Sequence, residues 1–277
     1  MSKLLAIDGD ILVYMIALSN ERSFYCCNGH LYKTKGKAEH AQTQNGGEIY
    51  RYRRLCPEAQ LQINLRSKMN SIFSDLNIRN YRLYITHPNI KKNFRYNLAS
   101  IKVYKENRAH KPKPHFYQQV RNLLVRDYSA EIIEGEEADD AIGKLATEQY
   151  NLYNNYEMLY IASIDKDLRM IPGYHYNLKS RVLVYIDEQE ASFNFWMQVV
   201  TGDRIDNIPG IYNWLVLQGK VDQAKELKKS RYLKKLKEEL KDVDMSQHEM
   251  KVRELYQKWH IPETVFNEVK ELIKIRR

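Results

Sequence analysis

Four short segments of the chain each carry two or more carboxylates. The densest is EGEEADDAIG (134–143), which has five acids within seven positions of a chain whose formal net charge is +9. The others are AIDGD (6–10), SIDKDLRMIPG (163–173) and TGDRIDNIPGI (201–211). Neighbouring carboxylates disfavour each other's ionised form, so such clusters need open solvent or a cation. Their oxygen donors favour a hard divalent cation, Mg²⁺ first, with Mn²⁺ as a substitute.

The densest segment also has a simpler interpretation as the start of a helix. Glu137 and Asp140 stand three residues apart and share a helix face, whereas Asp139 points about half a turn away from Glu137. The free N–H groups and dipole of a first turn favour acids without any metal. An acidic N-cap accounts for one or two carboxylates, and the other three segments favour a metal site.

The positive charge is concentrated in one stretch. Residues 91–126 hold ten Lys or Arg and one acid, Glu106, which equals the net charge of the whole chain. Tyr96, Tyr104, Phe116 and Tyr117 are interleaved with these cations, where bases or sugars can stack. The pattern predicts binding to a polyanion, with a solvated basic surface as the alternative. Phosphodiester hydrolysis requires carboxylates that bind metal ions, next to cations that hold the phosphate backbone of the nucleic acid.

The elements that position these residues follow from hydropathy. Short apolar runs at 3–7, 81–85, 158–162 and 182–186 predict buried strands, and 3.6-residue periods after Pro57 and Pro114 predict helices. This alternation predicts an α/β fold with a parallel sheet covered on both faces. Because ligands bind at the carboxyl ends of such strands, we expect the acids to converge there. Residues 20–56 predict a long excursion or weak hairpin, and residues from about 210 onward predict charged amphipathic helices.

Other function classes find less support. Three cysteines, Cys26, Cys27 and Cys56, give no disulfide framework and favour a reducing cytoplasm. Their spacing with His30 and His40 fits no standard zinc pattern. The apolar N-terminus is interrupted by acids and lacks a signal-peptide cleavage pattern, and no run predicts a membrane span.

The motifs resemble those of one known family. AIDGD, FRYNLASIKVYKENR, EGEEADDAIG, ASIDKDLRMIPG and GDRIDNIPGI stand in the order and approximate spacing of the 5′-to-3′ exonuclease and flap endonuclease family, from residue 4 to about 211. YKENRAHKPKPHF is most similar to the small stand-alone bacteriophage members. The resemblance implies a PIN-like 5′ nuclease core over residues 1–200, with a basic helical arch at about 88–126. Residues 201–277 would form a helical DNA-binding region with a modified helix-three-turn-helix.

The resemblance also implies roles for individual residues. Lys105 and Arg108 would contact the scissile phosphate, Tyr104 would stack on the terminal base, and Arg95 would flank the arch. Two metal ions, sharing Asp139, would be held by Asp8, Glu137, Asp139, Asp140, Asp165, Asp167, Asp203 and Asp206. Further DNA contacts are predicted at Lys91, Lys92, Lys102, Lys111 and Lys113.

The implied activity is Mg²⁺-dependent hydrolysis at DNA 5′ ends and flaps, with removal of RNA primers from RNA–DNA hybrids. A monomer in the host cytoplasm, working with replication proteins, would fit a phage-type system. Two departures from the family pattern stand out. Thr86, His87 and Asn89 occupy the region where the family carries an Asp, which leaves Asp10 or a neutral ligand as a substitute. YNWLVLQGKVDQ replaces a glycine-rich hairpin, which puts the family's monovalent-cation (K⁺) site in doubt. A DNA-binding replication factor with weakened catalysis and a PIN-like ribonuclease remain alternatives.

Overall fold

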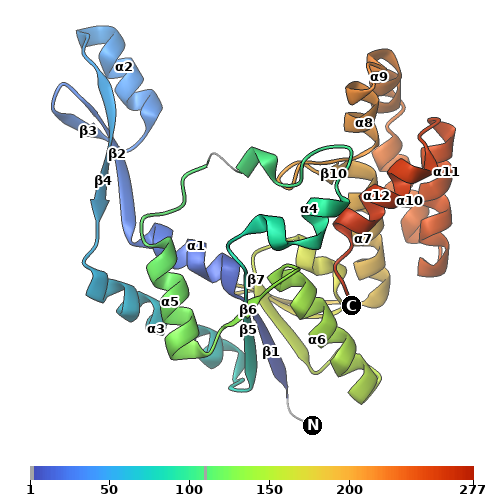
Figure 1. Ribbon diagram of the computed structural model, residues 1–277, viewed down its shortest axis with the longest axis horizontal. Helices are drawn as coiled ribbons and strands as arrows, with labels where there is room; N and C mark the ends of the chain where they lie inside the picture. Colours follow the sequence, from blue (N-terminus) through green and yellow to red (C-terminus); the bar gives the residue numbers. More distant parts are fainter. Residues whose placement is uncertain (1–2, 109–110) are drawn as a thin grey trace. The chain divides into compact units, whose positions relative to one another are not determined.

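The computed structural model describes residues 3–108 and 111–277, and the chain forms two compact units (Figure 1). The first unit contains Met1–Gly9, Ile78–Lys111 and Ala130–Arg277, and the second contains Asp10–Asn77 and Pro112–Ser129. This division differs from the boundary predicted at residue 200. It also separates the two halves of the basic segment, which was predicted to form a single arch.

The first unit is built on a six-stranded sheet, and the predicted α/β class is confirmed. Its strands, in the order β6-β5-β1-β7-β8-β9, are β6 (Glu131–Ile133), β5 (Tyr81–Thr86), β1 (Leu4–Asp8), β7 (Leu159–Ser163), β8 (Gly173–Asn177) and β9 (Leu183–Ile186). All neighbouring pairs are parallel except β8 and β9. Every residue of β1 is buried, as its continuous apolar run predicts for a central strand. The strand predicted at 182–186 is present as β9, but it is an antiparallel edge strand on which Leu183 and Tyr185 are exposed and only Ile186 is buried.

The register of the three central strands brings their carboxyl ends to one edge of the sheet. Asp8 of β1 lies beside Tyr84 of β5, and Ile7 lies beside Ala162 of β7. The last residues of the three strands are therefore neighbours at that edge. They are Asp8, Thr86 and Ser163.

Helix α6 (Ala138–Tyr153) packs against β1 and β5 through one apolar stripe. Ala138, Ile142 and Leu145 on this stripe are buried at the spacing of an amphipathic helix. Gly143 is required for a close approach, because a Cβ there would lie 2.3 Å from the carbonyl oxygen of Arg276. The C-terminal segment therefore lies directly against this helix.

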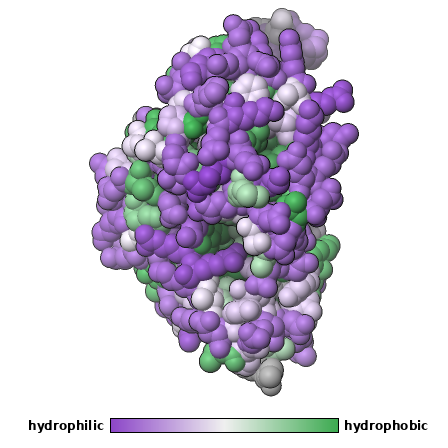
Figure 2. Space-filling model, turned by 90° about the vertical axis from the view of Figure 1, so that its right-hand side faces the viewer, coloured by the Kyte–Doolittle hydropathy of each residue, from purple (hydrophilic) through white to green (hydrophobic). Residues whose placement is uncertain are grey.

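The remaining elements of the first unit are mainly helical. They are η1 (Ile90–Lys92), α4 (Phe94–Leu98), η2 (Glu106–Arg108), η3 (Asp167–Met170), α7 (Glu188–Thr201), β10 (Gly202–Asp203), β11 (Ile208–Pro209), α8 (Ile211–Leu217), α9 (Val221–Lys229), α10 (Tyr232–Asp242), η4 (Met245–Gln247), α11 (His248–Lys258) and α12 (Glu263–Ile273). Helix α7 contacts α11 and α12. There Trp196 stacks on Phe266 at 6.2 Å, and the Tyr256 hydroxyl donates to the Val199 carbonyl oxygen at 2.7 Å. Hydrophilic side chains dominate the face drawn in Figure 2.

The second unit contains more regular structure than residues 20–56 predict. Its elements are α1 (Gly9–Ser19), β2 (Glu21–Cys27), β3 (His30–Tyr32), α2 (Lys35–Asn45), β4 (Ile49–Leu55), α3 (Glu58–Leu76) and α5 (Tyr117–Tyr128). The three strands form an antiparallel sheet in the order β3-β2-β4. Helices α3 and α5 pack together, as the periods after Pro57 and Pro114 predict. Within the described part of the chain, no helix has the length and apolar character to cross a membrane.

Candidate functional site

The loop after β7 is fastened to the end of β1 by a serine. Asp8 is 2% exposed, and its Oδ2 accepts a hydrogen bond from Ser163 Oγ at 2.7 Å. Ser163 Oγ in turn accepts from the Asp165 backbone N–H at 2.9 Å, and Asp165 Oδ1 accepts from the Asp167 N–H at 2.9 Å. Two of the acidic segments are thereby brought together. Ser163 was not among the predicted site residues, although a serine two positions before an acid is a common turn signal.

Asp139 lies where three other carboxylates converge. Burial raises the pKa of Asp139 well above its usual value, and repulsion from Asp8, Asp165 and Glu137 raises it further. The predicted convergence of the segments after β1, after β7 and at the start of α6 is therefore present. We call Asp8, Asp139 and Asp165 the acidic group.

A second pair of carboxylates adjoins this group. Burial raises the pKa of Asp167 to about 7, with added repulsion from Asp165 and Asp203. Burial would also raise the pKa of Asp203, but hydrogen bonds from Asp167 and from the backbone N–H groups of Asp206 and Ile205 hold it below its usual range. Asp167 and Asp203 therefore form a second interacting carboxyl pair beside the acidic group. The Oδ1 atom of Asp167 is buried and accepts no hydrogen bond.

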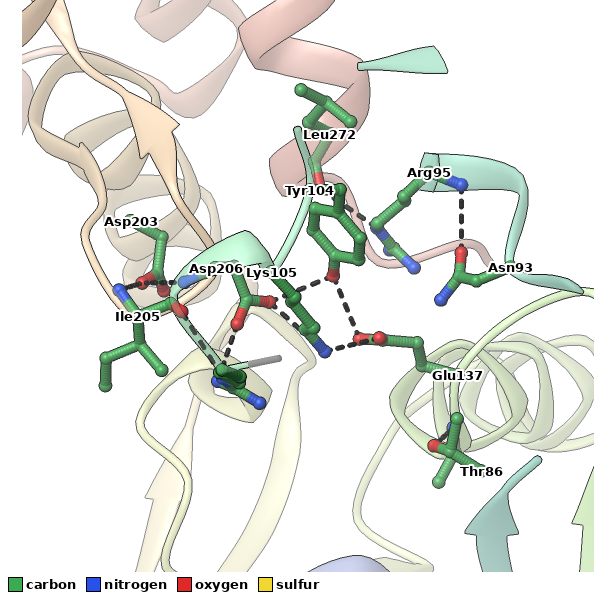
Figure 3. A network of polar contacts seen from close by, with 12 residues as sticks. Thr86, Asn93, Arg95, Tyr104, Lys105, Glu137, Asp203, Ile205, Asp206 and Leu272 are labelled. Atoms are coloured by element: carbon green, nitrogen blue, oxygen red, sulfur yellow. Dashed lines mark hydrogen bonds and ion pairs between the residues drawn. The ribbon is translucent and has the colours of Figure 1, made fainter. Parts of the chain in front are cut away.

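The two predicted phosphate-binding cations meet two predicted metal ligands, Glu137 and Asp206. Figure 3 shows Lys105 directed toward both carboxylates. Lys105 pairs closely with Glu137 and lies 3.4 Å from Asp206 Oδ2, while Arg108 lies 2.6 Å from Asp206 Oδ1. Burial would lower the pKa of Lys105, but the carboxylates of Glu137 and Asp206 raise it above its ordinary value. Lys105 is therefore held charged at the edge of the acidic group.

Tyr104 joins this network through its hydroxyl, which corrects its predicted stacking role. The hydroxyl bonds to Asp206 Oδ2 at 2.9 Å and lies 3.2 Å from Glu137 Oε2. The residue is only 2% exposed, so its ring offers no face to a base. Burial, followed by the charges of Glu137 and Asp206, raises the pKa of the hydroxyl well above its usual value, which keeps it a hydrogen-bond donor.

Asp140 and Arg95 require a second correction. Arg95 is 3% exposed and forms a double hydrogen bond with Asp140, at 2.5 and 2.8 Å. Its guanidinium also donates to the carbonyl oxygens of Leu272 and Lys274, and Asp140 accepts from the backbone N–H groups of Glu137 and Arg276. Burial would raise the pKa of Asp140, but the bonds and charge of Arg95 lower it. Both side chains are fully committed, which leaves Arg95 no contact with DNA and Asp140 no place among metal ligands.

The predicted lysine contacts fall into both units. Lys91, Lys92 and Lys111 are exposed in the first unit, where Lys102 is half-buried and Lys92 lies 3.3 Å from Glu134. Lys113 belongs to the second unit and lies over the ring of Tyr117 at 4.3 Å. Burial, and then the charge of Arg121, lower its pKa. These lysines are therefore divided between the two units.

The residues in the region of the missing Asp have structural roles. Thr86 Oγ1 accepts the backbone N–H of Ala138 at 3.0 Å and so caps the first turn of α6. His87 Nε2 lies 3.6 Å from Glu134, and Asn89 Oδ1 accepts the N–H of Lys91 at 3.1 Å. Asp10, the suggested substitute, lies 3.6 Å from Arg121 in the second unit.

The donor chemistry of the site suits a divalent cation. Within residues 3–108 and 111–277, no three His, Cys, Asp or Glu side chains are already arranged as a metal site. However, the acidic group carries repulsion that the charge of Lys105 offsets only in part, and Asp167 has a buried oxygen without a hydrogen bond. Carboxylate oxygens in this state fit a hard cation such as Mg²⁺.

Comparison of the structure with solved structures identifies its fold. A bacteriophage T5 flap endonuclease variant, solved as a pseudo-enzyme–product complex with DNA and metal ions, superposes with a TM-score of 0.51 at 13% identity, covering 98% of each chain. The chain has the fold of this 5′ nuclease. The T5 5′-exonuclease with bound zinc ions gives a TM-score of 0.47 at 14% identity, again covering 98% of each chain. No protein-family model and no curated protein sequence matches the chain. The predicted fold is therefore confirmed by the comparison with the T5 flap endonuclease structure alone.

Proposed function

We propose that this chain is a Mg²⁺-dependent 5′ nuclease that hydrolyses DNA phosphodiesters, as a 5′-to-3′ exonuclease or a flap endonuclease. The observation that carries the proposal is the meeting of Asp8, Asp139 and Asp165 at the carboxyl edge of the sheet, beside the cations Lys105 and Arg108. The fold and the order of the motifs support it. RNA primers in hybrids are included among the substrates, and residues 201–277 are proposed as the duplex-binding region.

The acidic group has the carboxylate oxygens to hold one divalent cation. Asp167 and Asp203 together have the oxygens to hold a second. Such ions supply positive charge to the phosphate and a water of lowered pKa. Glu137 and Asp206 position Lys105 and Arg108, and the Tyr104 hydroxyl orients both carboxylates. The side chains of Lys105 and Arg108 bind non-bridging oxygens of the phosphate and stabilise the charge that develops on it.

Cleavage of a 5′-labelled flap duplex in Mg²⁺ tests the proposal. We expect Asp139→Asn to slow cleavage by at least about 10²-fold, the scale on which removal of one charge-stabilising group acts. Glu134→Gln is the matched control from the same acidic segment, because Glu134 is exposed and pairs only at the surface. It should retain wild-type cleavage.

Three outcomes would redirect the assignment. Wild-type activity in the Asp139→Asn variant would remove the acidic group from the reaction. Salt-sensitive binding of the flap without product in Mg²⁺ or Mn²⁺ would favour the DNA-binding replication factor with weakened catalysis. Thr86 supports this alternative, because it lies in the region where the family carries an Asp and it caps α6 instead. Faster cleavage of single-stranded RNA than of DNA would indicate a ribonuclease.

A further inference from the structure

The antiparallel sheet of the second unit has one covered face and one open face (Figure 1). Residues directly opposite each other in an antiparallel pair share a face, so the register sorts the side chains. Cys27 belongs to the covered face, is 1% exposed, and donates through its thiol to the carbonyl oxygen of Gly46, directly after α2. Helix α2 therefore packs against that side.

The opposite side, which we call the open face, combines aromatic rings with arginines. The register pairs Arg22 with Arg54, Phe24 with Tyr52, and Cys26 with both Tyr50 and Leu31. The open face therefore consists of Arg22, Phe24, Cys26, Leu31, Tyr50, Tyr52 and Arg54. It contains two cations and no acid. Within it Phe24 is half-buried, and Cys26 is covered by its neighbours at 4% exposure.

Three side chains on this surface are exposed to a degree that the interior of a sheet rarely allows. Leu31, Tyr50 and Tyr52 are 54%, 58% and 46% exposed. Large apolar side chains gathered on one surface, and bordered by charge, mark an interaction site more often than scattered exposure does. Residues 21–55 as a whole carry seven Lys or Arg against three acids, and this positive charge favours an anionic partner.

We propose that the open face binds single-stranded nucleic acid, with bases stacked on Phe24, Tyr50 and Tyr52 and phosphates held by Arg22 and Arg54. Every base has a π-face, so aromatic rings on an open sheet bind a strand without regard to sequence. The arginines add charge and can stack as well. An acidic peptide would meet the charge but would leave three rings without planar partners, which is why a nucleic-acid strand fits better. This inference rests on residues 21–55 alone and does not depend on the nuclease assignment.

Binding of a labelled oligo-dT strand to the full chain in EDTA, followed by fluorescence anisotropy, tests the aromatic part. We expect the double variant Tyr50→Ala, Tyr52→Ala to raise Kd by about fivefold or more for each base that no longer stacks. The variant Tyr50→Phe, Tyr52→Phe keeps the rings and should retain wild-type affinity. Because these side chains are exposed, all variants should melt like the wild type. Equal affinity of the alanine variant and the wild type would overturn the proposal.

The two faces of β4 provide a matched control for charge. Arg22→Ala with Arg54→Ala changes the open face, and Arg51→Ala with Arg53→Ala removes the same charge from the other face. We expect the first pair to lower the salt dependence of binding by about 0.7 in log–log slope for each phosphate that is no longer bound, and the second pair to change it less. Equal effects of the two pairs, or full competition by a polyglutamate peptide, would contradict a single-strand site on the open face.

Discussion

Two adjacent aspartates at the start of α6 have opposite environments. Asp140 is buried against Arg95 and also accepts hydrogen bonds from two backbone N–H groups, so its pKa lies below the usual range. Asp139 is buried and faces other carboxylates, so its pKa lies well above that range. One residue of helix, about 100° of rotation, separates the two side chains.

The difference shows that acids in one cluster can have separate structural and functional roles. The charge of Asp140 is balanced within the protein, so it ties α4, α6 and the C-terminal segment together. The charge of Asp139 is balanced only in part, by Lys105, and a group kept in that state is a candidate for function. The same residue type in neighbouring positions thus holds the fold in one case and is available to a cation in the other.

Removing the charge at position 140 should have the largest effect on stability. Asp140→Asn leaves the guanidinium of Arg95 buried without its counter-charge, and we expect the free energy of unfolding to fall by about 3–5 kcal/mol. Denaturant unfolding monitored by circular dichroism measures it. Asp139→Asn is the matched control, the same substitution one residue away, and should leave the metal-free protein equally or more stable. Equal destabilisation by both variants would contradict the comparison.

The sequence alone predicts this contrast only in part. Spacing and the order of the acidic segments bring Asp8, Asp139 and Asp165 to one edge of the sheet, because parallel strands end together and local periodicity is strong. The partner of Asp140 is not visible in the same way. Arg95 lies 45 residues away along the chain, and its other partners, Leu272 and Lys274, lie 177 and 179 residues beyond it. Such a contact depends on tertiary packing of the C-terminal segment.

Tyr104 and the second unit also have features that depend on tertiary packing and that the sequence does not predict. A tyrosine beside Lys105 predicts stacking when only neighbours are considered, yet Asp206 arrives from a distant turn and binds the hydroxyl. Residues 20–56 lack a clear period because the sheet of β2, β3 and β4 keeps an aromatic face open, so its strands do not alternate between apolar and polar residues. Hydropathy therefore predicts the buried parallel sheet, but over residues 20–56 it predicts no more than a long excursion or a weak hairpin, where the structure has a three-stranded antiparallel sheet.

The stabilisation that Mg²⁺ provides should also differ between the Asp139 and Asp140 variants, by less than the difference in their free energies of unfolding. Adding Mg²⁺ to EDTA-treated protein at about 100 times Kd should stabilise it by about 2.7 kcal/mol, which raises the melting temperature by several degrees. Asp139→Asn should lose most of this shift, because a ligand and its charge are gone. Asp140→Asn should melt at a lower temperature yet keep the shift, measured as the difference between EDTA and Mg²⁺ scans. A full Mg²⁺ shift in Asp139→Asn would place the metal elsewhere.

The pH dependence of stability should differ in sign between the two environments. Asp140 has a lowered pKa, so its contribution is present above the ordinary aspartate pKa of about 4 and is lost as the pH falls below it. Asp167, beside the acidic group, has a pKa raised to about 7, so the folded metal-free protein binds more protons than the unfolded chain. Its stability should therefore decrease as the pH rises from about 4 to 7. We expect a loss of roughly 1–2 kcal/mol, less than the full pKa shift implies, because Asp167 and Asp203 titrate as an interacting pair.

Melting of the metal-free wild type and of Asp167→Asn across this range measures the second effect. The variant cannot ionise at this position, so its stability relative to the wild type should rise with pH and level off above pH 7. Asp140→Asn, measured in parallel, should show its full deficit throughout the same range and recover only at lower pH. If the two variants followed the same pH profile, the carboxylates of α6 and η3 would share one environment, and the division between a structural and a metal-binding role would fail.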